Sequence, residues 1–196
     1  MTPKPIKLVL LAAGASRRMN GRDKLLETIE GLPLLRRQAL AALAARIGPV
    51  AVTLPTESPD RHRAVADLDV TLLTIPDAHT GMSASLRAAA KWAQGAALMI
   101  CPADMPDVTA QDFATMAAGY KGQALCASDV DGKPGHPVVF PPQALPMFEA
   151  LKGDTGARGI LRRFTPQSIA LPAHHATTDL DTPEAWAKWR RENPSA

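Results

Sequence analysis

The chain has 196 residues, with 22 Lys and Arg against 19 Asp and Glu, which gives a formal net charge of +3. Hydrophobic residues make up 46% and charged residues 21% of it, a composition that excludes a mainly disordered chain. The small charge and an aromatic content of 4% argue against a nucleic-acid-binding surface. At this length we expect one domain, residues 1–196, with one hydrophobic core.

The longest apolar runs are residues 8–13 and 96–101, far short of the roughly 20 residues that cross a bilayer. The first of them is also too short for the apolar core of a secretory peptide. Cys101 and Cys126 form no C-x-x-C pair, which excludes a structural zinc site. We therefore expect a cytoplasmic protein with no membrane segment.

Short apolar runs alternate with amphipathic helical patterns from the N-terminus onward. Continuous apolar runs suit strands covered on both faces, and they predict buried strands at residues 6–12, 50–54, 70–75, 96–101 and 124–128. Helices are predicted between them, at residues 34–46, 60–67, 83–94 and 109–118. This alternation predicts an α/β fold with three layers and a mostly parallel sheet.

The pattern changes after Ser128. A Gly- and Pro-rich turn at residues 131–135 leads into a short strand at residues 136–140, which we expect to pair antiparallel. Helices are predicted at residues 141–151, 155–164 and 183–191, and a strand at residues 167–171.

The loop after the first predicted strand is rich in small and basic residues, and residues 11–26 read LAAGASRRMNGRDKLL. Small residues let backbone N–H groups approach a ligand closely, and the cations are Arg17, Arg18, Arg22 and Lys24. The loop follows a strand at the carboxyl edge of a parallel sheet, where α/β folds bind ligands. These features predict a polyphosphate site, and a solvated basic turn is the alternative.

Two familiar phosphate-binding loops are excluded. A Walker A motif ends in Gly-Lys followed by Ser or Thr, whereas this loop ends in Asp-Lys-Leu. The glycine pattern Gly-x-Gly-x-x-Gly of dinucleotide-binding folds is absent as well. Neither a P-loop kinase nor a dinucleotide-dependent dehydrogenase fits.

The loop resembles the signature Leu-Ala-Ala-Gly-x-Ser-x-Arg-Met-Gly-x-x-Lys-Leu-Leu of the molybdenum cofactor cytidylyltransferases, a branch of the molybdenum cofactor nucleotidyltransferases. Further matching segments are residues 81–86, 101–106, 135–138, 153–158 and 179–184, so the resemblance covers nearly the whole chain. One departure is Asn20, where the family usually has Gly. Because Asn tolerates positive φ better than other non-Gly residues, we expect the loop conformation to be kept.

The resemblance implies a Rossmann-like nucleotide-diphospho-sugar transferase fold. It implies Mg²⁺-dependent transfer of CMP from CTP to the terminal phosphate of molybdenum-bound molybdopterin, with release of pyrophosphate and formation of the cytosine dinucleotide cofactor. Residues 1–128 would form the nucleotide-binding half and residues 129–196 the acceptor-binding half. Mn²⁺ is a second candidate metal, and a molybdoenzyme or its maturation chaperone is a candidate partner.

Three alternatives stay open. The first is guanylyl transfer from GTP to the same cofactor, and the second is nucleotidyl transfer to another small phosphate such as a sugar phosphate. The third is a delivery chaperone that binds the cofactor without turnover.

Acidic residues in two segments are candidate metal ligands. Asp104 follows an apolar strand and stands between Pro102 and Pro106, which places a carboxylate at the sheet edge, and hard oxygen ligands suit Mg²⁺. Asp179 and Asp181 are two residues apart, so both point to one face of an extended segment. By resemblance one of them completes the metal site, with Asp181 preferred over Asp179. Capping of the helix that follows is the alternative.

The resemblance also implies roles for individual residues. Arg18, Lys24 and Asp104 would be catalytic, with Arg18 near the β- and γ-phosphates and Lys24 near the α-phosphate or the leaving group. Nucleotide contacts are implied for Leu11, Ala12, Ala13, Gly14, Arg18, Lys24, Gly81 and Ser85. Acceptor contacts are implied for His136, Asp154 and Arg158, and metal coordination for Asp104 and Asp181. The local alternatives are helix capping by Ser83 and an ion pair between Asp154 and Arg158.

The sequence shows no obvious arrangement of residues for a general base, and this chemistry needs none. A phosphate monoester that attacks the α-phosphorus is largely ionised at pH 7, because its second pKa is about 6. The reaction instead needs in-line positioning and compensation of the charge on pyrophosphate. Ala13 stands where the guanylyl branch has Gly, in Leu-Ala-Gly-Gly, and this favours CTP by analogy.

Overall fold

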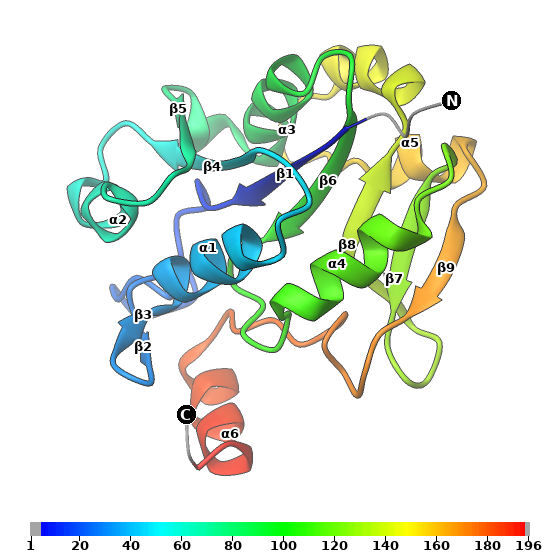
Figure 1. Cartoon of the computed structure of the whole chain (residues 1–196). Coiled ribbons are helices and arrows are strands. Elements are labelled where there is room, and N and C mark those ends of the chain that lie inside the picture. The colour runs from blue at the N-terminus through cyan, green and yellow to red at the C-terminus, as the bar shows by residue number, and fades with distance from the viewer. Residues whose placement is uncertain (1–4, 195–196) are drawn as a thin grey trace.

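A seven-stranded sheet forms the middle layer of the protein, as the computed structural model shows for residues 5–194 (Figure 1). Its strand order is β5-β4-β1-β6-β8-β7-β9, and β8 runs antiparallel to both of its neighbours while the other pairs are parallel. The predicted, mostly parallel sheet with a short antiparallel element is confirmed. The strands are β1 (Ile6–Leu11), β4 (Val50–Pro55), β5 (Thr71–Ile75), β6 (Ala97–Pro102), β7 (Leu125–Ser128), β8 (Pro134–Phe140) and β9 (Gln167–Ala170).

Helices cover both faces of this sheet, which gives the three predicted layers (Figure 1). Successive β1 side chains point to opposite faces, so Leu8 and Leu10 pack in one core and Val9 in the other. The first core is covered by α1 (Leu34–Ala44), α2 (Pro59–Val65), α4 (Ala110–Gly119) and α6 (Pro183–Glu192), and the second by α3 (Met82–Trp92), the 3₁₀ helix η2 (Pro142–Ala150) and α5 (Arg158–Arg163).

Three predicted elements differ from those observed. Residues 70–75 were expected to be buried, but β5 is an edge strand on which only Ile75 is fully buried, because β4 is its one neighbour. The helix predicted at residues 141–151 is the 3₁₀ helix η2, since Pro146 removes a backbone donor from its interior. The helix predicted at residues 155–164 begins only at Arg158. A small hairpin, β2 (Thr28–Ile29) with β3 (Leu32–Pro33), and the 3₁₀ turn η1 (Ala78–Thr80) were not predicted.

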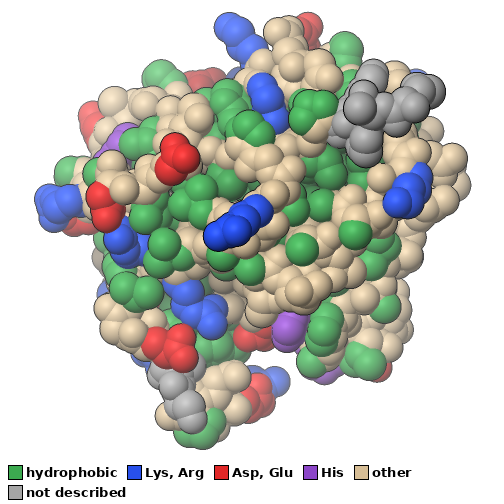
Figure 2. Space-filling model, viewed as in Figure 1, with side chains coloured by type: hydrophobic (Ala, Val, Ile, Leu, Met, Phe, Trp, Pro, Cys, Tyr) green, Lys and Arg blue, Asp and Glu red, His purple; other side chains and the backbone are tan. Residues whose placement is uncertain are grey.

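The carboxyl ends of β1, β4 and β6 meet at one edge of the sheet, because these strands are neighbours and parallel. The loops that follow them therefore gather at this edge, as in other open α/β sheets. Within residues 5–194, no helix has the length and apolar character that crossing a bilayer requires. Residues 1–4, which enter the expectation about a secretory segment, lie outside the described residues. Figure 2 shows Lys and Arg side chains spread among hydrophobic and acidic ones on the face that carries α1 and α4.

Candidate active site

The basic loop between β1 and β2 folds back on itself through left-handed residues and a short internal network. Asn20, with a φ of 51°, precedes Gly21, with a φ of 81°, so Asn adopts the expected conformation where the family usually has Gly. The Ser16 hydroxyl donates to Asp23 Oδ1 at 3.2 Å and accepts the backbone N–H of Lys24 at 3.3 Å. These contacts fix the backbone at Lys24.

Lys24 lies between two carboxylates from distant parts of the chain. Its Nζ is 2.5 Å from Asp104 Oδ2 and 2.5 Å from Asp181 Oδ1, and its side chain is 14% exposed. Burial alone would lower the pKa of Lys24, but the charges and hydrogen bonds of Asp104 and Asp181 outweigh it and raise that pKa. Lys24 is therefore a fixed positive charge at the edge of the sheet.

The segment that carries Asp179 and Asp181 is attached to the loop after β6. The backbone N–H of Leu180 donates to the Asp104 carbonyl at 3.1 Å, and Arg18 pairs with Asp181. The N-cap of α6 is Thr182, whose hydroxyl accepts from the Ala185 N–H at 3.2 Å. Thr182 therefore caps the helix, and neither Asp179 nor Asp181 does.

The two aspartates differ in their electrostatic surroundings. Burial and the charges of Asp181 and Asp104 raise the pKa of Asp179. Burial also opposes ionisation of Asp181, but Lys24 and Arg18 outweigh it and lower the pKa of Asp181. Asp181 is thus the more stable anion of the two, in line with its preference over Asp179 in the sequence analysis.

The carboxylates that meet here fit a divalent cation. Asp104 Oδ1 is buried and has no hydrogen-bond partner among residues 5–194, although Oδ2 is paired with Lys24. A buried carboxylate oxygen without a partner costs free energy unless something binds it. Hard oxygen ligands from Asp104 and Asp181 match what Mg²⁺ and Mn²⁺ prefer.

A cleft of about 610 Å³ opens beside this cluster. Most of the predicted nucleotide-binding residues line it, together with Asp104 and Asp154. Arg17, to which the sequence analysis assigned no nucleotide contact, also lines it, whereas Arg18, a predicted contact, pairs with Asp181 and does not line it. The predicted residues on its wall are Leu11, Ala12, Ala13, Gly14, Lys24, Gly81, Ser85, Asp104 and Asp154.

The second half of the chain closes one side of this cleft through a backbone contact. The Ser83 N–H at the start of α3 donates to the Gly153 carbonyl at 3.1 Å, while the N-cap of α3 is Gly81 rather than Ser83. A Cβ on Gly81 would lie 2.4 Å from the Gly153 carbonyl carbon and 2.6 Å from Asp154 Oδ1. The close approach therefore requires glycine at position 81.

The remaining predicted acceptor residues, His136 and Arg158, do not line the cleft. His136 is largely buried, its Nδ1 has no partner among the described residues, and burial lowers the pKa of its imidazole. Its ring is close enough to Asp104 to sense that charge. Arg158 begins α5, and no ion pair joins it to Asp154 in the part of the chain that the structure describes.

Arg61 is a residue that the sequence analysis did not single out. It projects from α2, is 4% exposed, and pairs with Asp23 of the basic loop. The surrounding sequence, Pro-Asp-Arg-His-Arg, is typical of a solvated helix turn, so no local signal distinguished this arginine from Arg63, which is exposed.

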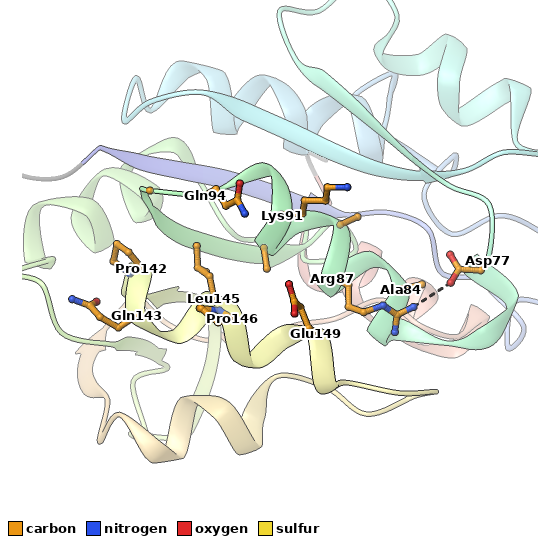
Figure 3. A pocket seen from close by; sticks show the side chains of 13 residues that line it. Asp77, Ala84, Arg87, Lys91, Gln94, Pro142, Gln143, Leu145, Pro146 and Glu149 are labelled. Atoms are coloured by element: carbon orange, nitrogen blue, oxygen red, sulfur yellow. Dashed lines mark hydrogen bonds and ion pairs between the residues drawn. The ribbon is translucent and has the colours of Figure 1, made fainter.

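A larger groove of about 820 Å³ between α3 and η2 does not contain these groups (Figure 3). Arg87 reaches toward Asp77 there, at 3.1 Å, and donates to the Leu151 carbonyl at 2.8 Å. Its guanidinium is thus used to tie neighbouring segments together. Lys24, Asp104 and the basic loop instead line the smaller cleft.

A family profile, the MobA-like NTP transferase domain, matches residues 8–171. The purine catabolism protein PucB of Bacillus subtilis (strain 168) is 28% identical over 196 residues, covering 93% of this chain and 95% of PucB. The crystal structure of Rv0371c from Mycobacterium tuberculosis H37Rv has a TM-score of 0.84 and 25% identity, covering 96% of this chain and 98% of that one. Another structure of Rv0371c is a complex with manganese, at a TM-score of 0.77 and 22% identity, covering 94% and 97%.

Molybdopterin-guanine dinucleotide biosynthesis protein A from Archaeoglobus fulgidus shares the fold at 16% identity, with a TM-score of 0.69 and coverage of 97% of this chain and 100% of that one. The expected fold class and the expected enzyme class are both confirmed by these similarities. Because the family profile spans most of the sequence, the chain belongs to the MobA-like NTP transferase family and is a nucleotidyltransferase.

Proposed function

We propose that the protein transfers CMP from CTP to the terminal phosphate of molybdenum-bound molybdopterin, releasing pyrophosphate and forming the cytosine dinucleotide cofactor. The observation that carries this proposal is the position of Lys24, held between Asp104 and Asp181 beside the small-residue loop. A protein that only carried a finished cofactor would have no need to concentrate these charges at one point of the cleft.

Asp104 and Asp181 would hold Mg²⁺ or Mn²⁺, which when bound would offset the negative charge of the triphosphate. The manganese complex of Rv0371c supports a divalent metal in the related fold. Lys24 supplies a second, permanent positive charge next to the same carboxylates. We assign the outer phosphates to Arg18, which pairs with Asp181, and add Arg17 because it lies on the cleft wall.

The acceptor would enter from the side of the cleft formed by the second half of the chain. Asp154 lies on the cleft wall there, and His136, on the antiparallel strand β8, is close enough to Asp104 to sense its charge. The Nδ1 atom of His136, which has no partner among the described residues, is the atom that we assign to a hydrogen bond with the acceptor. Arg158 is the third residue that we assign to the acceptor. A molybdoenzyme or its maturation chaperone, in the cytoplasm, is the partner that we propose for the product.

The test is pyrophosphate release with Mg²⁺ and molybdenum-loaded molybdopterin, with CTP and GTP assayed in parallel. Turnover with CTP alone supports the proposal. Turnover with GTP alone would instead favour guanylyl transfer, and turnover with a sugar phosphate in place of molybdopterin would change the acceptor. Binding of the cofactor without turnover of either nucleotide would favour the delivery chaperone.

Replacing Ala13 with Gly is expected to raise the relative use of GTP. Ala13 is 7% exposed, lines the cleft and packs against Ile75 and Ala84, and we infer that its methyl group limits the size of the base that binds beside it. One methyl group in such a pocket changes discrimination by roughly tenfold or more. The measurement is the ratio of kcat/KM for CTP to that for GTP. An unchanged ratio in a variant with the wild-type melting temperature would contradict a selective role for Ala13.

A further inference from the structure

Arg61 is directed into the protein from a helix that is otherwise largely exposed. In α2, Pro59, Asp60 and Arg63 are exposed, whereas the Arg61 side chain is 4% exposed. Burial of a guanidinium is unfavourable unless its charge and its donors are matched. The partners of Arg61 therefore indicate what it is used for.

Every N–H of this guanidinium has an acceptor in the basic loop. Nε and Nη2 form a bidentate pair with Asp23, at 2.6 Å to Oδ2 and 2.8 Å to Oδ1. Nη1 donates to the carbonyl oxygens of Ala12, at 2.7 Å, and Gly14, at 2.8 Å. Nη2 also donates to the Ser16 hydroxyl at 3.1 Å. One side chain thus holds the loop along its length.

The two carbonyl contacts determine where the neighbouring amides point. In a planar trans peptide, the C=O of one residue and the N–H of the next point in opposite directions. Because Arg61 draws the carbonyls of Ala12 and Gly14 toward itself, the N–H groups of Ala13 and Ala15 face away from it. Neither N–H has a hydrogen-bond partner within residues 5–194, and both residues line the cleft.

We propose that Arg61 is a positioning residue that orients the amide N–H groups of Ala13 and Ala15 to donate to the phosphates of the nucleoside triphosphate. This inference rests on the proposed function, since it assumes that a triphosphate occupies the cleft. Asp23 neutralises the guanidinium, so Arg61 acts through the geometry of the loop and not as an attractive charge for the anion. Fixed backbone donors bind phosphate without the entropy cost of ordering a loop.

The variant that tests this is Arg61→Lys, which keeps the positive charge but cannot hold Asp23 and both carbonyls at once. Its matched control is Arg36→Lys. Arg36 likewise forms a bidentate pair, with Asp67, and donates to the Ala64 carbonyl at 3.0 Å, but it lies between α1 and α2 and does not line the cleft. Affinities for tripolyphosphate and for CTP with Mg²⁺ are measured by calorimetry, and the melting temperature of each variant is recorded.

We expect Arg61→Lys to bind tripolyphosphate about tenfold more weakly or worse, because hydrogen bonds to a charged group contribute at that level. Arg36→Lys should bind like the wild type, even where both variants lose stability. In ¹⁵N spectra of the wild type, the amides of Ala13 and Ala15 should shift on binding of tripolyphosphate, and this measurement needs no variant.

Equal tripolyphosphate affinity in the wild type and folded Arg61→Lys overturns the inference, as does the absence of a shift at both amides. A wild type that binds triphosphate through these amides but releases no pyrophosphate leaves the inference standing while the proposed function fails. A wild type that binds no triphosphate overturns both.

Discussion

Replacing Asp104 with Asn is expected to lower the rate of pyrophosphate release by about 100-fold or more, while the protein keeps its fold. The substitution replaces one carboxylate oxygen of the side chain with an amide nitrogen, which is no metal ligand, and it removes the negative charge that faces Lys24. The contact from the Leu180 N–H is made by the backbone of residue 104, so it does not depend on the side chain. Single-turnover pyrophosphate release and Mn²⁺ binding measure the two consequences.

The matched control for Asp104 is Asp107→Asn, in the same loop. The Asp107 carboxylate accepts the indole N–H of Trp189 at 2.8 Å and has no place on the cleft wall. Its loss should reduce stability slightly and leave the rate unchanged. A wild-type rate in Asp104→Asn would contradict a role for Asp104 as a metal ligand. An equal loss of activity in Asp104→Asn and Asp107→Asn would contradict it as well.

Replacing Lys24 with Met should have opposite effects on two measurements. Pyrophosphate release should fall by about 100-fold, because the charge that meets the reacting phosphates is lost. Binding of Mn²⁺ in the absence of nucleotide should strengthen by about fivefold or more, since the ammonium no longer competes for Asp104 and Asp181. Electron paramagnetic resonance of free Mn²⁺ gives the affinity, and the pyrophosphate assay gives the rate.

The control for Lys24 is Lys121→Met, because Lys121 is exposed and donates only to a nearby carbonyl, that of Ala118. It removes the same net charge far from the carboxylates and should change neither quantity. Weaker Mn²⁺ binding by Lys24→Met would mean that the lysine supports the cation site instead of occupying part of it.

Local patterns predicted most of the sheet because each central strand is a continuous apolar run. The runs at residues 50–54 and 96–101 became β4 and β6 with shifts of a single residue at their ends. The same argument overestimated the burial of β5, because an apolar run does not indicate whether a strand lies at the edge or in the middle of the sheet. The strand predicted at residues 136–140 begins earlier, at Pro134, because the Gly- and Pro-rich sequence there is typical of a turn.

The candidate site was predictable where a residue follows a strand, as Lys24 and Asp104 do within the motifs quoted above. The pairing of Lys24 with Asp181 depends on a segment 157 residues away, which no local pattern specifies. Arg61 was missed for the same reason, because its partners lie 38 to 49 residues away and its helix resembles an ordinary surface turn. The residue types therefore predicted which side chains could take part in the reaction, whereas contacts between distant segments required the structure.

The position of the antiparallel strand β8 limits which parts of the chain could be exchanged during evolution. It belongs to the second half of the sequence, yet it lies between β6 and β7, both of which come from the first half. A chain ending at Ser128 would therefore leave two strand edges facing an empty position in the sheet, an arrangement that invites aggregation. Because β8 completes the pairing of both β6 and β7, the C-terminal part cannot be exchanged without rebuilding the sheet.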